Sequence, residues 1–132
     1  MVLVDTSVWV DLFRNRKTRG SARLRAMLDE KRPFALTPLI VQEILQGAAD
    51  EHQFAVLDEY LASQSMLEPR HPVDTHRQAA RLYFDCRRRG FTPHSTIDCL
   101  IAQIALEHDV PLLHADRDFE RIAKVAPNLE FA

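Results

Sequence analysis

The first seven residues constrain the fold more than any other stretch of the chain. Met1–Val4 is a short apolar run that includes two β-branched valines, which is typical of a buried strand. The run ends at Asp5, and the hydroxyls of Thr6 and Ser7 follow where a helix cap is needed, just before the apolar segment 8–13. Ligands of open parallel sheets bind outside the carboxyl ends of the strands. Asp5 is therefore a candidate functional residue, although a turn or cap residue would also suit this position.

Strands and helices alternate along the rest of the chain. After the first strand, short apolar runs predict further strands at residues 34–36, 65–67 and 110–113, and an edge strand at 129–131. Between them, helical spacing of apolar residues predicts helices within residues 8–13, 21–30, 37–47, 50–61, 73–89, 95–105 and 119–123. This alternation predicts an α/β fold with a parallel sheet and helices on both faces.

Composition sets the broad class. With 132 residues, 46% of them hydrophobic, residues 1–132 fit a single domain with a full core. No apolar run reaches membrane-spanning length and no leader precedes the first strand, so we expect a cytoplasmic protein that does not contact membranes. Cys86 and Cys99 lie in predicted helices without metal-ligand spacing, which favours reduced thiols.

Positive charge is concentrated locally, although the net charge of −2 gives no global sign of nucleic-acid binding. One early stretch is opposed there only by Asp29 and Glu30, and it contains Arg14, Arg16, Lys17, Arg19, Arg23, Arg25, Lys31 and Arg32. Arg87, Arg88 and Arg89 form a second cluster. Most such runs are solvated faces; the alternative is a surface that holds phosphates.

Four acids from distant parts of the chain are expected at one edge of the sheet. Asp5 ends the first strand and Asp116 follows the fourth, so both lie at the carboxyl edge. The helix after the second strand begins at that edge and carries Glu43 on its packed side. The helix that leads into the fourth strand also begins there, with Asp98 in its first turn. The topology therefore predicts that these four carboxylates converge.

Each of these acids also has an ordinary structural explanation. Asp98 could form a capping box with Ser95, Glu43 could reach solvent, and Asp116 with Asp118 could be turn residues. These explanations are acceptable singly. Together they are less so, because one topology brings all four acids to one place.

A cluster of carboxylates needs a cation or protonation. Two like charges about 4 Å apart cost on the order of 4 kcal/mol at an effective dielectric near 20. Oxygen-only donors, without cysteine or histidine at matching spacing, favour Mg²⁺ or Mn²⁺. Sites of this kind commonly act on phosphate esters.

Four ordered motifs resemble the PIN-domain ribonucleases and, within that family, the VapC toxins of bacterial toxin–antitoxin pairs. They are Val-Asp-Thr-Ser-Val-Trp-Val-Asp-Leu at Asp5, Val-Gln-Glu-Ile-Leu-Gln-Gly at Glu43, Thr-Ile-Asp-Cys-Leu-Ile-Ala at Asp98 and Leu-Leu-His-Ala-Asp-Arg-Asp-Phe at Asp116. The resemblance implies a three-layer α/β/α fold with a central five-stranded parallel sheet. It also implies a homodimer that hydrolyses RNA phosphodiesters and is inhibited by a VapB-type antitoxin.

The same resemblance implies roles for individual residues. Asp5, Glu43, Asp98 and Asp116 would be the acidic quartet around Mg²⁺ or Mn²⁺, with Asp118 as an auxiliary acid. Thr6 or Ser7 would orient a carboxylate or metal-bound water. His114 could touch substrate, but a satisfied loop histidine fits better. The basic stretch, with Arg14 and Arg16 foremost, would bind the RNA backbone.

Other classes fit less well. A haloacid-dehalogenase-like phosphatase needs a second aspartate where this chain has Ser7, and a receiver domain needs paired acids beside Asp5 and a lysine at a strand end, whereas Lys124 lies in a predicted helix. Two alternatives stay open: a housekeeping PIN-domain nuclease without an antitoxin, and a non-catalytic module that binds RNA or a partner.

Overall fold

Strands and helices follow one another in the order that the sequence predicts. The structure is a computed structural model that describes residues 1–132. Its strands are β1 (Val2–Val4), β2 (Phe34–Leu36), β3 (Ser65–Met66) and β4 (Leu112–Leu113). Its helices are α1 (Thr6–Phe13), α2 (Arg19–Asp29), α3 (Pro38–Gln46), α4 (Glu51–Ala62), α5 (Pro72–Arg88), α6 (Thr96–Glu107) and α7 (Arg117–Ile122).

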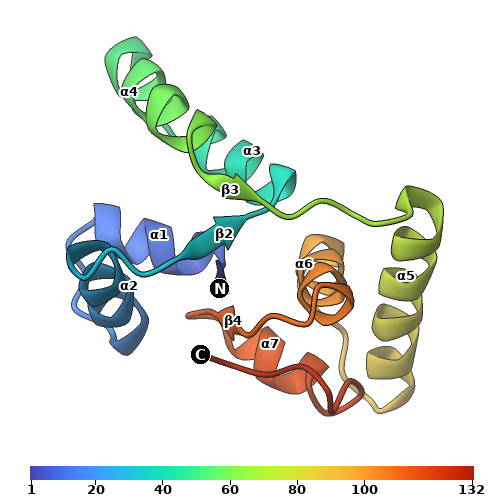
Figure 1. The fold of residues 1–132 in the computed structure, drawn as a ribbon. Helices are drawn as coiled ribbons and strands as arrows, with labels where there is room; N and C mark the ends of the chain where they lie inside the picture. Colours follow the sequence, from blue (N-terminus) through green and yellow to red (C-terminus); the bar gives the residue numbers. More distant parts are fainter.

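The strands form one parallel sheet in the order β3-β2-β1-β4. In Figure 1, α1 and α2 lie on one side of the strands and α5 and α6 on the other. Central strands of such a sheet face helices on both sides, which explains why Leu3, Val4, Ala35 and Leu36 are fully buried. The predicted α/β class with helices on both faces is confirmed.

The expected fifth strand is not formed. Residues 129–131 make only an isolated parallel bridge between Leu112 and Phe131. The backbone hydrogen bonds there run from Leu112 N to Glu130 O and from Ala132 N to Leu112 O. Since β4 is only two residues long, it offers this segment too little backbone for a further strand. The sheet therefore has four strands instead of five.

The start of the first helix also differs from the expectation. Thr6 is already helical, and the cap is Asp5, whose Oδ2 accepts a hydrogen bond from the backbone N–H of Ser7. A carboxylate caps a helix as well as a hydroxyl does. By contrast, α3 begins as predicted, with Thr37 as its cap and Pro38 in its first turn.

The chain reverses its direction of travel across the sheet at β1. It moves from β1 to β2 and β3 on one side, and later returns to pair β4 with the other side of β1. In α/β folds, the crevice at such a reversal is where ligands bind. Asp5 follows β1 and Asp116 follows β4, so these two acids flank the crevice.

The chain has neither a disulfide nor a helix suited to a membrane. Cys86 and Cys99 are buried free thiols. None of the helices combines the length and the hydropathy that crossing a lipid bilayer would require.

Candidate active site

Asp5 is held firmly at the end of β1. Its backbone N–H donates to the carbonyl of Leu113 at 2.9 Å, and its side chain is almost fully buried. Oδ2 accepts two hydrogen bonds from Ser7, from the backbone N–H at 3.0 Å and from Oγ at 2.6 Å. Burial raises the pKa of Asp5, while the bonds from Ser7 oppose that rise. Oδ1 is left without a protein donor.

Glu43 is joined to the same corner by Thr6. The Thr6 hydroxyl donates to Glu43 Oε1 at 2.8 Å and so ties α1 to α3. Glu43 is half-buried, and burial raises its pKa, the Thr6 bond lowers it, and the charge of Asp5 raises it again. The inward orientation predicted for Glu43 is thus observed, and Oε2 is left without a donor.

Asp98 is not a helix cap. The cap of α6 is Ser95, whose Oγ accepts from the N–H of Ile97, and the Asp98 carboxylate accepts no hydrogen bond. The pKa of Asp98 is raised to about 7, first by burial and then by the negative charges of Asp5, Asp116, Asp118 and Glu43. The negative charges of the other acids therefore all act on the Asp98 carboxylate, as expected if these residues form one cluster.

Asp116 and Asp118 have different surroundings, although both lie at the start of α7. Asp116 caps the helix with Oδ1, which accepts from the N–H of Asp118 at 3.0 Å. Asp118 is buried, and its Oδ2 lies 2.9 Å from both the backbone nitrogen and the ring Nδ1 of His94. Burial alone would raise the pKa of Asp118, but His94 and then Arg121 bring it below its usual value.

His94 is the residue of this site that the sequence did not reveal. Its ring is largely exposed in the loop before α6, and it contacts an acid 24 positions away. No motif or spacing links a loop histidine to an acid on another helix, so only the folded chain shows the pair.

Ser7 and Thr6 have separate roles. Thr6 reaches Glu43, whereas Ser7 contacts Asp5 and also accepts a hydrogen bond from the N–H of Ala115 at 3.0 Å. Ser7 thereby joins the end of β1 to the loop after β4. The two hydroxyls thus contact two carboxylates, those of Asp5 and Glu43, and the backbone of a third segment at Ala115.

His114 fits the interpretation as a satisfied loop histidine. Its ring packs against Phe119 and Phe131, with centroids 5.2 and 4.5 Å away, and its Nδ1 accepts from the N–H of Asp116. Burial lowers its pKa, which favours the neutral ring.

The two foremost arginines of the basic stretch lie in unlike places. Arg14 lines a groove of about 250 Å³ between α1, α3 and α4 that also contains Glu43. Arg16 is exposed and lies 3.7 Å from Asp11 Oδ1, so part of its charge is already balanced. Of the two, only Arg14 lines a groove together with a member of the acidic quartet.

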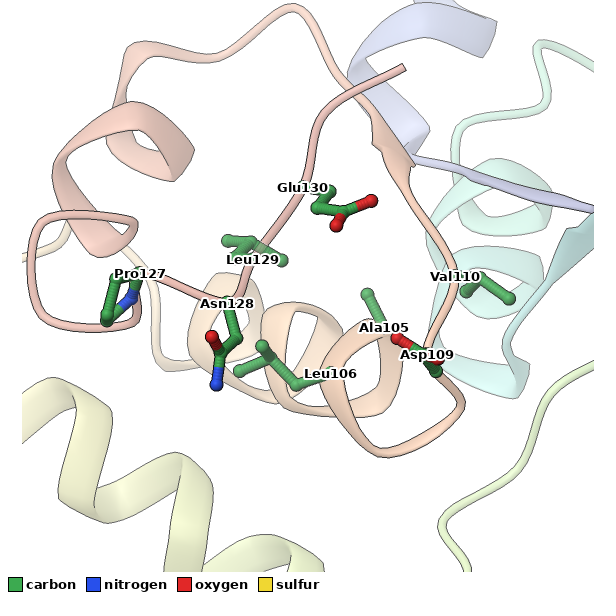
Figure 2. Close-up of a pocket in the computed structure, with 8 residues that line it drawn as sticks. All are labelled: Ala105, Leu106, Asp109, Val110, Pro127, Asn128, Leu129 and Glu130. Atoms are coloured by element: carbon green, nitrogen blue, oxygen red, sulfur yellow. The ribbon is translucent and has the colours of Figure 1, made fainter.

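A separate pocket lies at the other end of the sheet. Figure 2 shows it between the end of α6, with Leu106, and the C-terminal segment, with Leu129 and Glu130. Its wall includes Val110, just before β4 begins, which is the amino edge of the sheet. This pocket of about 320 Å³ therefore does not belong to the acidic site.

The donor set suits a hard divalent cation. The four acids offer only oxygen, and every one of them keeps at least one carboxylate oxygen without a protein hydrogen bond. As the side chains stand, no three acidic, histidine or cysteine groups are placed to hold one ion together. Burial and the charges of the other acids both raise the pKa of Asp98, and a bound cation would lower the cost of keeping these acids ionised. The residues thus fit Mg²⁺ or Mn²⁺ chemically, with side-chain rotation needed for coordination.

The raised pKa of Asp98 predicts the effect of neutralising it. In metal-free protein, ionised Asp98 destabilises the fold, and this penalty grows as pH rises from its ordinary value of 3.8 through about 7. In EDTA at pH 8, Asp98→Asn should melt above wild type, by on the order of 1 kcal/mol or about 3–5 °C after allowance for solvent screening. Thermal melts at several pH values measure this gap, which should close toward pH 4.

Asp74 provides the matched control. It is also a first-turn acid, on α5, and it is exposed. Asp74→Asn should leave the melting temperature unchanged or lower it, because it removes a favourable interaction with the helix dipole. Equal behaviour of the two variants would show that Asp98 is only a first-turn acid.

Comparison with known proteins agrees with this geometry. The PIN domain family matches residues 2–125. VapC ribonuclease Mb1587 of Mycobacterium bovis and ribonuclease VapC11 of Mycobacterium tuberculosis are each 36% identical over 133 residues, covering 100% of this chain and 98% of theirs.

Solved structures share the fold. A DNA-bound VapBC from Salmonella typhimurium has a TM-score of 0.74 at 21% identity, covering 99% of this chain and 96% of that one. VapBC2 from Rickettsia felis, bound to a promoter DNA fragment, has a TM-score of 0.73 at 18% identity, covering 100% and 98%. The family match over residues 2–125 and the 36% identity to VapC ribonucleases over the whole chain agree with the acids at the reversal point of the parallel sheet. This chain belongs to the PIN-domain family, in the VapC group.

Proposed function

We propose that this protein is the toxin of a type II toxin–antitoxin system and acts as a metal-dependent endoribonuclease. The observation that carries the proposal is the placement of Asp5, Glu43, Asp98 and Asp116 at the carboxyl edge of one parallel sheet. Burial first, and then the charges of the other acids, raise the pKa of Asp98 there to about 7. A fold that tolerates such repulsion in the absence of a ligand is suited to binding a cation. Full-length identity of 36% to VapC ribonucleases supports RNA as the substrate.

Asp5, Glu43, Asp98 and Asp116 would hold Mg²⁺ or Mn²⁺. When bound, such an ion neutralises phosphate charge and lowers the pKa of the attacking water. Asp118 would be an auxiliary acid, because its carboxylate already contacts His94 and its backbone N–H donates to Asp116.

Hydroxyl side chains position two of the acids and favour their ionised forms against the effect of burial. Ser7 donates to Oδ2 of Asp5 and Thr6 donates to Oε1 of Glu43, and neither hydroxyl bonds the second oxygen of its acid. We assign no general-base role to histidine, since His114 is packed between aromatic rings and His94 is paired with Asp118. Arg14, in the groove beside Glu43, would hold RNA phosphate, and Arg16 contributes less because it faces Asp11.

The proposed partners are a VapB-type antitoxin and a second copy of the chain. The antitoxin assignment draws on the VapBC relatives named above. We place the protein in the cytoplasm, where its buried free thiols would stay reduced. A housekeeping nuclease is the alternative, and a reading frame for an antitoxin next to the gene decides between the two.

Metal-dependent cleavage is the direct test. Purified protein should cut RNA with Mg²⁺ or Mn²⁺ and stop when EDTA is added, as followed by gel electrophoresis of end-labelled RNA. Asp5→Asn should lower the rate by about a hundredfold or more, because it removes a proposed metal ligand. Asp109→Asn is the control: this acid is exposed at the opposite edge, and its positive φ of 52° suits asparagine. Full activity of the Asp5 variant would refute the assignment of the site.

Thr6 tests whether the hydrogen bond to Glu43 positions that acid. Thr6→Val keeps the shape of the side chain but removes the donor, so the pKa of Glu43 should rise further. We expect cleavage about tenfold slower or more, with the acidic limb of its pH profile moved to higher pH. Thr6→Ser keeps the hydroxyl and should keep both the rate and the profile. A pH profile identical in the valine and serine variants would show that Thr6 is merely structural.

A further inference from the structure

A second concentration of positive charge lies outside the acidic edge, around the end of α5. We call it the α5 basic surface. It consists of Phe84, the three arginines around its ring and two further cations that line a neighbouring hollow with Arg81 and Arg88: Arg81, Arg87, Arg88, Arg89 and Lys124. The only acid among them is Asp85. Five positive charges against one negative give this surface a charge of +4, whereas the whole chain has a net charge of −2.

Phe84 is an exposed aromatic ring among arginines. The guanidinium carbons of Arg81, Arg87 and Arg88 lie 5.3, 5.8 and 5.8 Å from its ring centroid, which is within the range of cation–π attraction. The ring itself is 37% exposed, so part of its surface is open. Proteins combine an open aromatic face with cations to stack unpaired bases and hold the adjoining phosphates.

Most of these charges are not neutralised within the protein. Arg81 pairs with Asp85 at 3.1 Å, but no carboxylate pairs with Arg87 or Arg88. Arg89 donates to the carbonyl of Lys124 at 3.1 Å, which fixes the end of α5 against the residues after α7. Between these two elements is a hollow of about 480 Å³, lined by both and open to solvent. The cations are therefore free to bind an external anion.

The α5 basic surface is continuous with the acidic edge. Beyond α5 the chain turns at Gly90, and Phe91 then lies under the guanidinium of Arg121, 5.2 Å from the ring centroid. Arg121 in turn lies 3.8 Å from Asp118, whose N–H donates to Asp116. One cation–aromatic contact, one ion pair and one hydrogen bond thus lead from the segment after α5 to Asp116, a member of the acidic quartet.

Helix stabilisation accounts for only part of this arrangement. Arg87 and Arg88 lie in the last turn of α5, where the helix dipole favours positive charge. Arg81 lies one and a half turns or more earlier, and Lys124 is not on this helix. Neither the dipole nor packing explains why Phe84 is exposed among the arginines.

We propose that the α5 basic surface binds an unpaired segment of the RNA substrate beyond the cleavage site, with its arginines on phosphates and Phe84 stacked on a base. This inference rests on the proposed ribonuclease function and adds a second contact region to it. The arginines would strengthen binding to any RNA, whereas Phe84 would favour unpaired RNA, because the bases of a duplex are already stacked.

The test measures RNA affinity separately from cleavage. Fluorescence anisotropy in EDTA follows binding of an unpaired, fluorescein-labelled RNA and of the same RNA annealed to its complement, over a series of salt concentrations. The variants are Arg87→Gln/Arg88→Gln and Phe84→Leu. The matched control is Arg70→Gln/Arg77→Gln, which removes two exposed charges near the start of α5, outside both the α5 basic surface and the early basic stretch. Thermal melts accompany every variant.

We expect the Arg87/Arg88 variant to bind unpaired RNA about tenfold more weakly or worse, and its salt slope to fall by about 0.7 for each lost phosphate contact. Phe84→Leu should weaken the binding of unpaired RNA by about fivefold or more and leave the affinity for duplex RNA unchanged, since leucine keeps the apolar contact but cannot stack on a base. The control should bind as wild type does.

Failure of the proposal is distinguishable from failure of the function. If wild type cleaves RNA with Mg²⁺ but the Arg87/Arg88 variant binds with unchanged affinity and salt slope, the α5 basic surface is only a stabilised helix end. Equal weakening by the control would show that only total charge matters, which also overturns the proposal. If Phe84→Leu loses affinity equally for unpaired and for duplex RNA, the assignment of this surface to unpaired RNA is refuted. Wild type that neither binds nor cleaves RNA would refute the function and this site together.

Discussion

Repulsion between carboxylates is the interaction on which the rest of this structure depends. The parallel sheet places acids at one edge because its strands all end there. Helices α1, α3 and α7 start there after β1, β2 and β4, and α6, which leads back into β4, starts there too. Burying them and bringing them together both cost free energy, and the pKa of Asp98 is raised first by burial and then by the charges of the other acids. The surrounding contacts limit that cost without removing it: hydroxyl and N–H donors stabilise Asp5 and Glu43, and Asp98 is left without any.

Two of the acids serve the fold and the site with the same side chain. Asp5 caps α1 and Asp116 caps α7, each through one carboxylate oxygen. The partial positive charge at a helix N-terminus favours an acid there, so capping offsets part of the repulsion between them. Because each cap uses only one oxygen, the other stays available. Capping of α1 by Asp5 is therefore compatible with the metal-binding role proposed for the same side chain.

The sequence predicted the fold class and the placement of the acids because both follow from short-range patterns. Apolar runs and turn residues located β1, β2 and α3, and strand order alone then brought Glu43 and Asp98 to the carboxyl edge. Details that depend on contacts between distant segments were less predictable. The prediction of a fifth strand was wrong because the apolar pattern at 129–131 carries no information on the length of β4, the strand with which this segment would have to pair. The capping box at Ser95 and Asp98 was wrong for a related reason: the pattern is local, but burial and neighbouring charge decide where the carboxylate lies.

The hydrogen bond from Ala115 to Ser7 has a consequence for how the protein is made. It joins residues 108 positions apart, and Asp116 lies just beyond it. During synthesis, the first strand and its aspartate are made 108 residues before the segment that this hydrogen bond attaches to them. A chain still being extended on the ribosome therefore has no complete site, however well its first half has folded. Contacts this distant in sequence also form slowly. For a chain of a ribonuclease family, the order of synthesis thus delays the assembly of the candidate site until Ala115 and Asp116 have been made.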